Sequence, residues 1–233
     1  MFERVYTKLR LSDVILGREP QLIEQVGRVR RVEAHENFVH QGEASTVLHF
    51  LLTGYACRYK LLSDGRRQIA AILVPGDSCD LHGLLQKTLD YSVKTLTDCT
   101  IVEIPRSAAL GWTETHPRLT RALWWSCMAD EAVLREWLAN VARHDARQRI
   151  AHLFCDLLFR LQAVGLAREN SYDFPLTQEE LGDMTGLSTV HVNRTLQELR
   201  IDGSVILKGR RMTIIDIERL KTIGAFEGSY LKV

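Results

Sequence analysis

The sequence has almost no excess of charge of either sign. Its 233 residues include 30 lysines and arginines against 29 aspartates and glutamates, which gives a formal net charge of +1. The balance excludes an attraction of nucleic acid to the molecule as a whole, so any such affinity has to come from a local patch. The sequence also lacks a signal-peptide pattern and any apolar run long enough to span a bilayer. We therefore expect a cytoplasmic protein with no membrane partner.

Paired cysteines are missing as well. The five cysteines are scattered singly, with no CxxC pair among them: Cys57, Cys79, Cys99, Cys127 and Cys155. Such usage is typical of a reducing compartment and excludes a disulfide framework.

The H-x-H spacing of a metal site on one strand is also absent. A metal-dependent, cupin-like enzyme is an alternative function class, because small barrels can hold a metal through two histidines and a carboxylate. By residue type its candidate ligands are His35, Glu36, His40 and His49. Without the spacing we interpret these as surface or strand-rim side chains, and we predict no metal and no enzymatic activity.

Residues 176–203 have the pattern of two short helices joined by a tight turn. Thr177 can cap the first helix, and Glu180 stands three residues later, where it completes a capping box. Gly186 follows at the point where a helix end favours a residue that tolerates positive φ. Ser188 can then cap the second helix.

The second helix of this pair has an apolar and a polar face. Val192, Leu196 and Leu199 recur at helical spacing and predict a buried stripe. The opposite face carries Thr189, Val190, Asn193, Arg194 and Gln197. Small, amide and guanidinium side chains are the types that read base edges in the major groove, so the pattern predicts a helix-turn-helix DNA reader. A simple packing hairpin is the alternative.

A β-hairpin with a basic turn is predicted after these helices. Apolar runs at 205–207 and 212–215 flank Lys208, Gly209, Arg210 and Arg211. A helix-turn-helix followed by such a hairpin is a winged helix, whose tip cations can approach the phosphate backbone.

The amino-terminal half has a different pattern. Residues 1 to about 29 predict one or two short helices, the second beginning at Pro20. From about residue 32 to 104 the apolar period becomes two, with glycine-containing turns between the runs. Strands are predicted at 46–50, 55–61, 68–74 and 100–104, and Asp64-Gly65 is the best hairpin signal. Many short strands of this kind favour a β-sandwich or barrel.

A long helix is predicted from Pro117 to about Val141. Its near-heptad apolar positions are Trp124, Cys127, Leu134, Leu138 and Val141. This is more apolar surface than one partner needs, so the helix either packs lengthwise on its own barrel or pairs with a second copy. We favour pairing.

The chain after this helix forms the start of the last domain. Asp145 can cap a further helix with a buried stripe at Ile150, Leu153, Leu157 and Leu161. Residues 163–173 are predicted as a polar connection into the helix-turn-helix.

In this order the parts resemble the Crp/Fnr superfamily of bacterial transcription regulators. Gly42, Gly54, Gly65 and Gly76-Asp77 stand where that family's barrel turns lie, and Asp145, Arg149 and Ile150 resemble the start of its DNA-binding domain. The resemblance implies an α+β fold with a cyclic-nucleotide-binding-like β-barrel of the jelly-roll type at 1–115. A dimerisation helix at 116–142 and a winged helix-turn-helix at 143–233 follow.

The resemblance also implies a homodimer, joined through the helix around 124–141, that reads a palindrome with its two recognition helices about 34 Å apart. Arg194 matches a family arginine and is expected to read guanine, while Val190 departs from the family glutamate and suits a thymine methyl group. RNA polymerase is a further possible partner. The expected DNA contacts are Thr177, Ser188, Thr189, Val190, His191, Asn193, Arg194, Gln197, Lys208 and Arg210.

The family's cyclic AMP anchors are missing. By resemblance the effector pocket includes Leu81, His82, Tyr91 and Ser92, with Leu81 at the position of the ribose-binding glutamate and Tyr91 at that of the phosphate-binding arginine. A buried phosphate without a cation is costly, so we predict no cyclic-nucleotide binding.

Other cofactors are not expected either. No cysteine precedes Cys57, so the amino-terminal iron–sulfur cluster of oxygen-sensing relatives is not available. Haem ligation by His82 or Cys79, or redox sensing by Cys79, is an alternative, but we interpret both as ordinary buried or rim side chains. The signal is an unknown small molecule or a redox change, or there is none and the regulator is constitutive.

Overall fold

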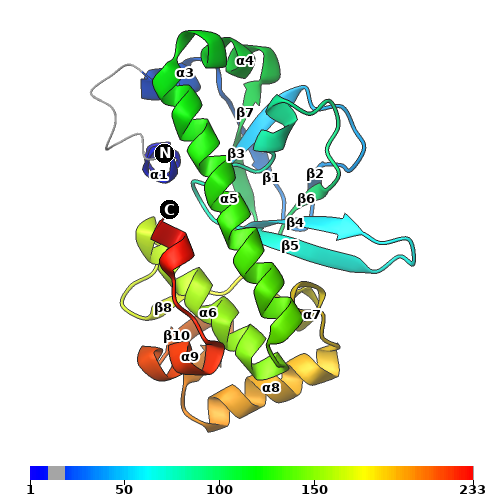
Figure 1. Cartoon of the computed structure of the whole chain (residues 1–233), viewed down its shortest axis with the longest axis vertical. Coiled ribbons are helices and arrows are strands. Elements are labelled where there is room, and N and C mark those ends of the chain that lie inside the picture. Colours follow the sequence, from blue (N-terminus) through cyan, green and yellow to red (C-terminus); the bar gives the residue numbers. More distant parts are fainter. Residues whose placement is uncertain (10–18, 233) are drawn as a thin grey trace. The chain divides into compact units, whose positions relative to one another are not determined.

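The computed structural model describes residues 1–9 and 19–232 of the chain. They form two compact units, residues 1–130 and residues 131–233. Helix α5 (Pro117–Arg143), the long green helix in Figure 1, begins in the first unit and ends in the second. Within the described residues, no helix is long and apolar enough to cross a membrane. The predicted α+β class is confirmed.

The strands of the first unit form two antiparallel sheets, in the orders β1-β7-β3 and β2-β6-β4-β5. Their bounds are β1 (Arg28–Val32), β2 (Asn37–Val39), β3 (Val47–Thr53), β4 (Ala56–Leu61), β5 (Arg67–Leu73), β6 (Ser92–Thr95) and β7 (Cys99–Pro105). The four strands predicted from alternation are confirmed to within a few residues. The prediction of helix up to about residue 29 is wrong at its end, because Arg28 already pairs with Glu103 of β7.

Strand β3 of the sheet β1-β7-β3 is buried on both faces, whereas β1 at the sheet's edge is largely exposed. Leu48, Phe50 and Leu52 of β3 pack into a core that they share with helices, whereas Leu51 between them packs into the core between the two sheets. Because successive side chains of a strand point to opposite faces, a strand buried on both sides has a continuous apolar run.

The helices of the first unit pack against the outer face of this sheet. They are α1 (Glu3–Lys8), α3 (Glu19–Val26), the 3₁₀ turn η1 (Leu81–Leu84), α4 (Arg106–Thr115) and the first turns of α5. Trp112 of α4 and Leu119 of α5 are both buried in the shared core. Helix α4 was not predicted from the sequence.

The second unit combines helices with a small sheet of order β8-β10-β9. Its elements are α6 (Ala146–Ala163), β8 (Ser171–Asp173), α7 (Gln178–Thr185), α8 (Thr189–Ile201), β9 (Val205–Lys208), β10 (Arg211–Ile214), α9 (Ile217–Gly224) and η2 (Ser229–Lys232). Asp145 caps α6 in a capping box with Gln148, as the sequence predicted for the cap. The predicted stripe of α6, Ile150, Leu153, Leu157 and Leu161, is buried.

The prediction that residues 163–173 form only a polar connection is wrong. The last three residues are strand β8, which pairs with β10 through Tyr172 and Met212. Tyr172 is fully buried, and its hydroxyl donates a hydrogen bond to the carbonyl oxygen of Phe154 at 3.0 Å. The edge of the wing hairpin is thereby paired rather than left open.

Two turn glycines of the first unit allow a matched stability test. Both have positive φ, +84° at Gly54 and +82° at Gly65, but a Cβ on Gly54 would lie 2.3 Å from the Asp98 carbonyl oxygen. At Gly65 no heavy atom lies within 4 Å of that position. We expect Gly65→Ala to cost about 1 kcal/mol of unfolding free energy, for its backbone conformation alone. Gly54→Ala should cost more than about 2 kcal/mol, because backbone must also move. Equal losses in urea unfolding would contradict this.

Candidate nucleic-acid interface

Helix α7 begins with a complete capping box. The Thr177 hydroxyl oxygen accepts from the Glu180 backbone N–H at 3.2 Å, and the Glu180 carboxylate accepts from the Thr177 N–H at 2.9 Å. Two backbone donors that the helix cannot satisfy itself are thus paired. The carboxylate of Glu180 is itself buried, so its position is fixed.

The turn between α7 and α8 depends on two glycines. Gly186 has φ +71°, in the left-handed region, as the sequence predicted. Gly182 was not singled out from the sequence, yet a Cβ there would lie 2.6 Å from the Leu187 carbonyl oxygen. Leu187 also donates its N–H to the Gly182 carbonyl oxygen at 3.2 Å, so α7 and the turn approach as closely as backbones can.

Helix α8 has the two faces that the sequence predicted. Ser188 caps it by accepting from the His191 N–H at 3.3 Å. Val192, Leu196 and Leu199 are at most 3% exposed. The predicted reading side chains Thr189, Val190, His191, Asn193, Arg194 and Gln197 are all exposed.

The exposed face of α8 is chemically mixed. The Arg194 side chain is 65% exposed and lies near Glu198, with 3.7 Å between Nε and Oε1. Val190 is 79% exposed at the start of the helix. Asn193 donates from Nδ2 to Oε1 of Gln178 at 3.2 Å, which links the exposed faces of α8 and α7. This interaction with Gln178 was not predicted.

Two arginines of α6 hold the two helices in place. Arg149 donates from Nη1 to the Thr185 carbonyl oxygen at the end of α7, at 2.9 Å. Its Nε donates to the carbonyl oxygen of His144, at 2.8 Å. Arg147 forms an ion pair with Asp202, the residue that ends α8. Both guanidinium groups meet helix carboxyl ends, where the backbone dipoles favour positive charge.

The wing is the hairpin β9–β10, with Gly209 in its turn at φ +60°. Lys208 and Arg210 are exposed there, as predicted. Arg211 is also exposed, but it pairs with Asp173 of β8 at 3.0 Å. Lys208 and Arg210 therefore remain the better candidates for phosphate contacts.

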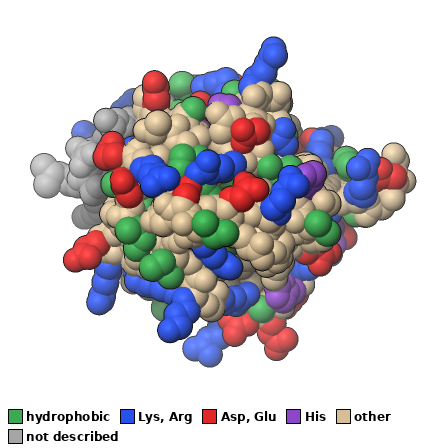
Figure 2. Space-filling model, turned by 90° about the horizontal axis from the view of Figure 1, so that it is seen from below, with side chains coloured by type: hydrophobic (Ala, Val, Ile, Leu, Met, Phe, Trp, Pro, Cys, Tyr) green, Lys and Arg blue, Asp and Glu red, His purple; other side chains and the backbone are tan. Residues whose placement is uncertain are grey.

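The face of the molecule drawn in Figure 2 shows no continuous basic surface. Lys and Arg side chains are interspersed there with Asp and Glu side chains. This distribution agrees with the net charge of +1. Recognition by such a surface has to depend on particular side chains rather than on bulk charge.

The residues of the expected effector pocket lie in different environments. Leu81 is buried in the helix-lined core, and Ser92 is buried at the start of β6. Tyr91 is half-buried and interacts with exposed His82 through its hydroxyl and the ring Nδ1, at 3.0 Å. Burial raises the pKa of the Tyr91 phenol, so this group stays neutral.

A buried cation that was not predicted from the sequence lies beside Tyr91. Arg58 of β4 is 8% exposed, and its guanidinium carbon lies 5.8 Å from the centre of the Tyr91 ring. Its Nη2 donates to the carboxylate of Asp130 at 2.8 Å. Burial is the largest single effect and disfavours the charge, but the attraction and hydrogen bond of Asp130, together with Tyr91 and Cys79, outweigh it, so the pKa of Arg58 is raised. Leu81 and Tyr91 themselves lack charge, as the sequence analysis noted, but a cation that is paired with Asp130 lies close to Tyr91.

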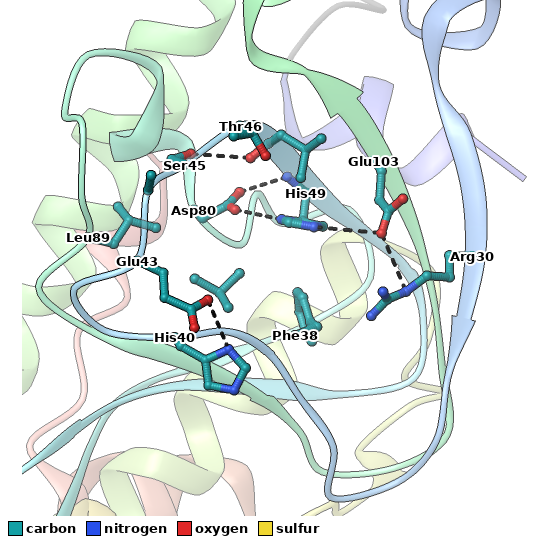
Figure 3. Close-up of a pocket in the computed structure, with 13 residues that line it drawn as sticks. Arg30, Phe38, His40, Glu43, Ser45, Thr46, His49, Asp80, Leu89 and Glu103 are labelled. Atoms are coloured by element: carbon teal, nitrogen blue, oxygen red, sulfur yellow. Dashed lines mark hydrogen bonds and ion pairs between the residues drawn. The ribbon is translucent and has the colours of Figure 1, made fainter.

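A separate polar pocket of about 220 Å³ lies among β1, β2, β3 and β7 (Figure 3). At its buried end, Nδ1 of His49 lies 2.6 Å from Asp80, and the Asp80 carboxylate also accepts from the His49 N–H. The other ring nitrogen of His49 faces Glu103 at 4.0 Å, and Glu103 in turn pairs with Arg30 at 3.4 Å. The two ring nitrogens of His49 thus face two carboxylates, one of which also meets Arg30.

The pocket does not bring the four candidate metal ligands together. Of the four ligand candidates, His40 and His49 line it, while His35 and Glu36 do not. His40 pairs with Glu43, and His49 pairs with Asp80. Across residues 1–9 and 19–232, no three His, Cys, Asp or Glu side chains are placed to hold a metal ion.

Two protein-family models match the chain. The one described as a cyclic nucleotide-binding domain matches residues 29–116, which hold both sheets of the first unit. The one described as a Crp-like helix-turn-helix domain matches residues 148–223, which hold α7, α8 and the wing. The two matches follow one another in the order found in the fold.

Individual relatives match across both units. The transcriptional activator protein FnrL of Cereibacter sphaeroides is 29% identical over 202 residues, 85% of this chain and 81% of that protein. A CRP-like cAMP-activated global transcriptional regulator of Mycobacterium tuberculosis is 26% identical over 218 residues, 91% of this chain and 96% of that protein. The structure of FixK2 from Bradyrhizobium japonicum matches with a TM-score of 0.78 and 25% identity, over 87% of this chain and 99% of that one.

The cysteine beside the effector pocket is expected to be unreactive. Burial raises the pKa of the Cys79 thiol well above its ordinary value, and Asp80 adds to the effect. Since the thiolate is the reactive form, we expect labelling of native Cys79 to be at least about 100-fold slower than in the unfolded chain. Half-buried Cys127 is the control and should react first, as followed by mass spectrometry with N-ethylmaleimide. Rapid labelling of Cys79 would restore it as a redox candidate.

Proposed function

Because the chain belongs to the Crp/Fnr family of transcription regulators, we propose that it acts as a homodimer that binds a palindromic promoter site without cyclic AMP. The cytoplasm is its proposed location and RNA polymerase its further partner. We propose the functional division predicted from the sequence: a barrel domain at 1–115, a dimerisation helix at 116–142 and a DNA-binding domain at 143–233.

The geometry of α8 is the observation that carries the DNA-binding role. Its buried stripe directs Arg194 outward, and Val190 is exposed one turn earlier. A guanidinium can bind O6 and N7 of guanine together, and valine methyl groups can contact a thymine methyl. Ser188 and the wing cations Lys208 and Arg210 suit phosphate contacts, which position the protein without selecting a sequence.

The exposed face of α5 supports a dimer. Four large apolar side chains of this one helix are exposed: Trp124 (64%), Met128 (57%), Leu134 (51%) and Leu138 (69%). Such a run on a helix surface marks an interaction site, and a symmetric pair of chains can bury the same face of both helices.

Two side chains argue against cyclic AMP as the signal. Leu81 offers no acceptor for a ribose hydroxyl, and Tyr91 offers no charge to a phosphate. The nearby Arg58 is a cation, but it is already paired with Asp130. No cofactor is proposed for His82 or Cys79.

Replacing Arg194 tests the reading role. We expect Arg194→Ala to cost about 1–3 kcal/mol on the preferred DNA and to relax the preference at one base pair of each half-site. The wing variant Arg210→Ala is the control. It should keep the sequence preference and lower the slope of log affinity against log salt by about 1. Selection from a randomised palindrome library, followed by titrations, measures both. An unchanged preference in Arg194→Ala would remove this residue from readout.

Introducing a charge into the exposed face of α5 tests the dimer. We expect Leu138→Glu to weaken dimerisation by at least about 2 kcal/mol, because each dimer would bury two uncompensated carboxylates. Ile201→Glu, at an 86% exposed position on α8, is the matched control and should leave the dimer intact. Sedimentation equilibrium gives both constants. A monomeric wild type would refute the dimer.

A further inference from the structure

The guanidinium of Arg58 is hydrogen-bonded to the backbone of the segment 78–80, close to residues of the expected effector pocket. Its Nε donates to the Cys79 carbonyl oxygen at 2.8 Å, and Nη2 donates to the Ser78 carbonyl oxygen at 2.5 Å. The third bond goes from Nη2 to Asp130 on α5. Three of the five N–H donors of the side chain are therefore used within the first unit.

The positive charge of Arg58 is of the kind that the missing family arginine would supply. It comes from β4 instead of from position 91, yet it lies over the ring of Tyr91. The anion that it meets is a side chain of this chain, Asp130, which is 26% exposed. Asp130 stands on the same helix as the exposed apolar face, two residues after Met128.

We propose that the Asp130 carboxylate serves as an internal substitute for an effector's anionic group, so that its pairing with Arg58 docks α5 on the barrel without any small molecule. The inference rests on the proposed function, since it explains how the dimer would reach its DNA-binding form. Asp130 and Arg58 are positioning residues in this scheme, because neither touches DNA.

The energetics favour such a role. A cation that is 8% exposed needs a partner, and removal of one member of a buried pair leaves an uncompensated charge. Docking of α5 thus becomes sensitive to a single carboxylate. By contrast, the next residue, Glu131, pairs with Arg135 on the surface, where both side chains are more than 60% exposed. Such exposed pairs contribute little.

The test compares Asp130→Asn and Arg58→Met with the control Glu131→Gln in the full-length protein, dialysed free of small molecules. Hydrogen exchange over 117–130 reports docking of α5, and fluorescence anisotropy on the selected palindrome reports DNA affinity. We expect residues 117–130 of the first two variants to exchange about tenfold faster than in wild type. The same two variants should bind DNA about tenfold more weakly. Glu131→Gln should stay within about twofold.

The double variant Arg58→Met/Asp130→Met keeps the test decisive if a single variant fails to fold, because it leaves neither charge unpaired. Its losses of α5 protection and of DNA affinity should be no larger than those of the more impaired single variant, since the two residues act as one pair. Additive losses would overturn the proposal.

Two other outcomes would also overturn the inference. One is that Asp130→Asn and Arg58→Met match Glu131→Gln in both measurements. The other is that millimolar cyclic AMP raises wild-type DNA affinity more than tenfold. Failure of wild type to select any DNA sequence would instead refute the proposed function, while the hydrogen exchange would still test docking of α5.

Discussion

Burial of one stripe of α8 decides what the DNA-binding surface presents. Val192, Leu196 and Leu199 are enclosed, and because an α-helix turns once in 3.6 residues, their burial leaves Val190 and Arg194 outward. The close approach at Gly182 and the left-handed Gly186 then set how α8 follows α7. Apolar packing and backbone geometry therefore orient the side chains that are proposed to read DNA, and no excess of positive charge is needed to do so.

The same reasoning applies to α5, which has apolar side chains on more than one face. Leu119 and Leu123 are buried in the helix-lined core of the first unit, whereas Trp124 and Met128 of the same helix are exposed. A helix with two apolar faces needs two partners, and the barrel supplies only one of them. The core of the first unit and the proposed dimer interface thus share a single element.

Local features of this fold could be predicted from the sequence, and long-range ones could not. The caps at Asp145, Thr177 and Ser188 depend on backbone groups only three residues away, so the sequence alone predicts them. Strand β8 depends on pairing with β10, about 40 residues later in the chain, and its three residues have no alternating pattern of their own. Arg58 is similar: its partner Asp130 lies 72 residues away, and an arginine on a strand carries no signal that it is buried.

The segment 78–80 is held from two sides, and this explains why an ion pair there matters more for geometry than for stability. Asp80 binds the backbone and ring of His49, while the carbonyl oxygens of Ser78 and Cys79 accept from Arg58. A buried ion pair is rarely more stabilising than apolar packing of the same volume, but it is directional. In the structure Asp130 meets this guanidinium while Trp124 and Met128 of the same helix are exposed. If the Arg58–Asp130 pair sets how α5 packs on the barrel, it also selects the apolar face that the proposed dimer would bury.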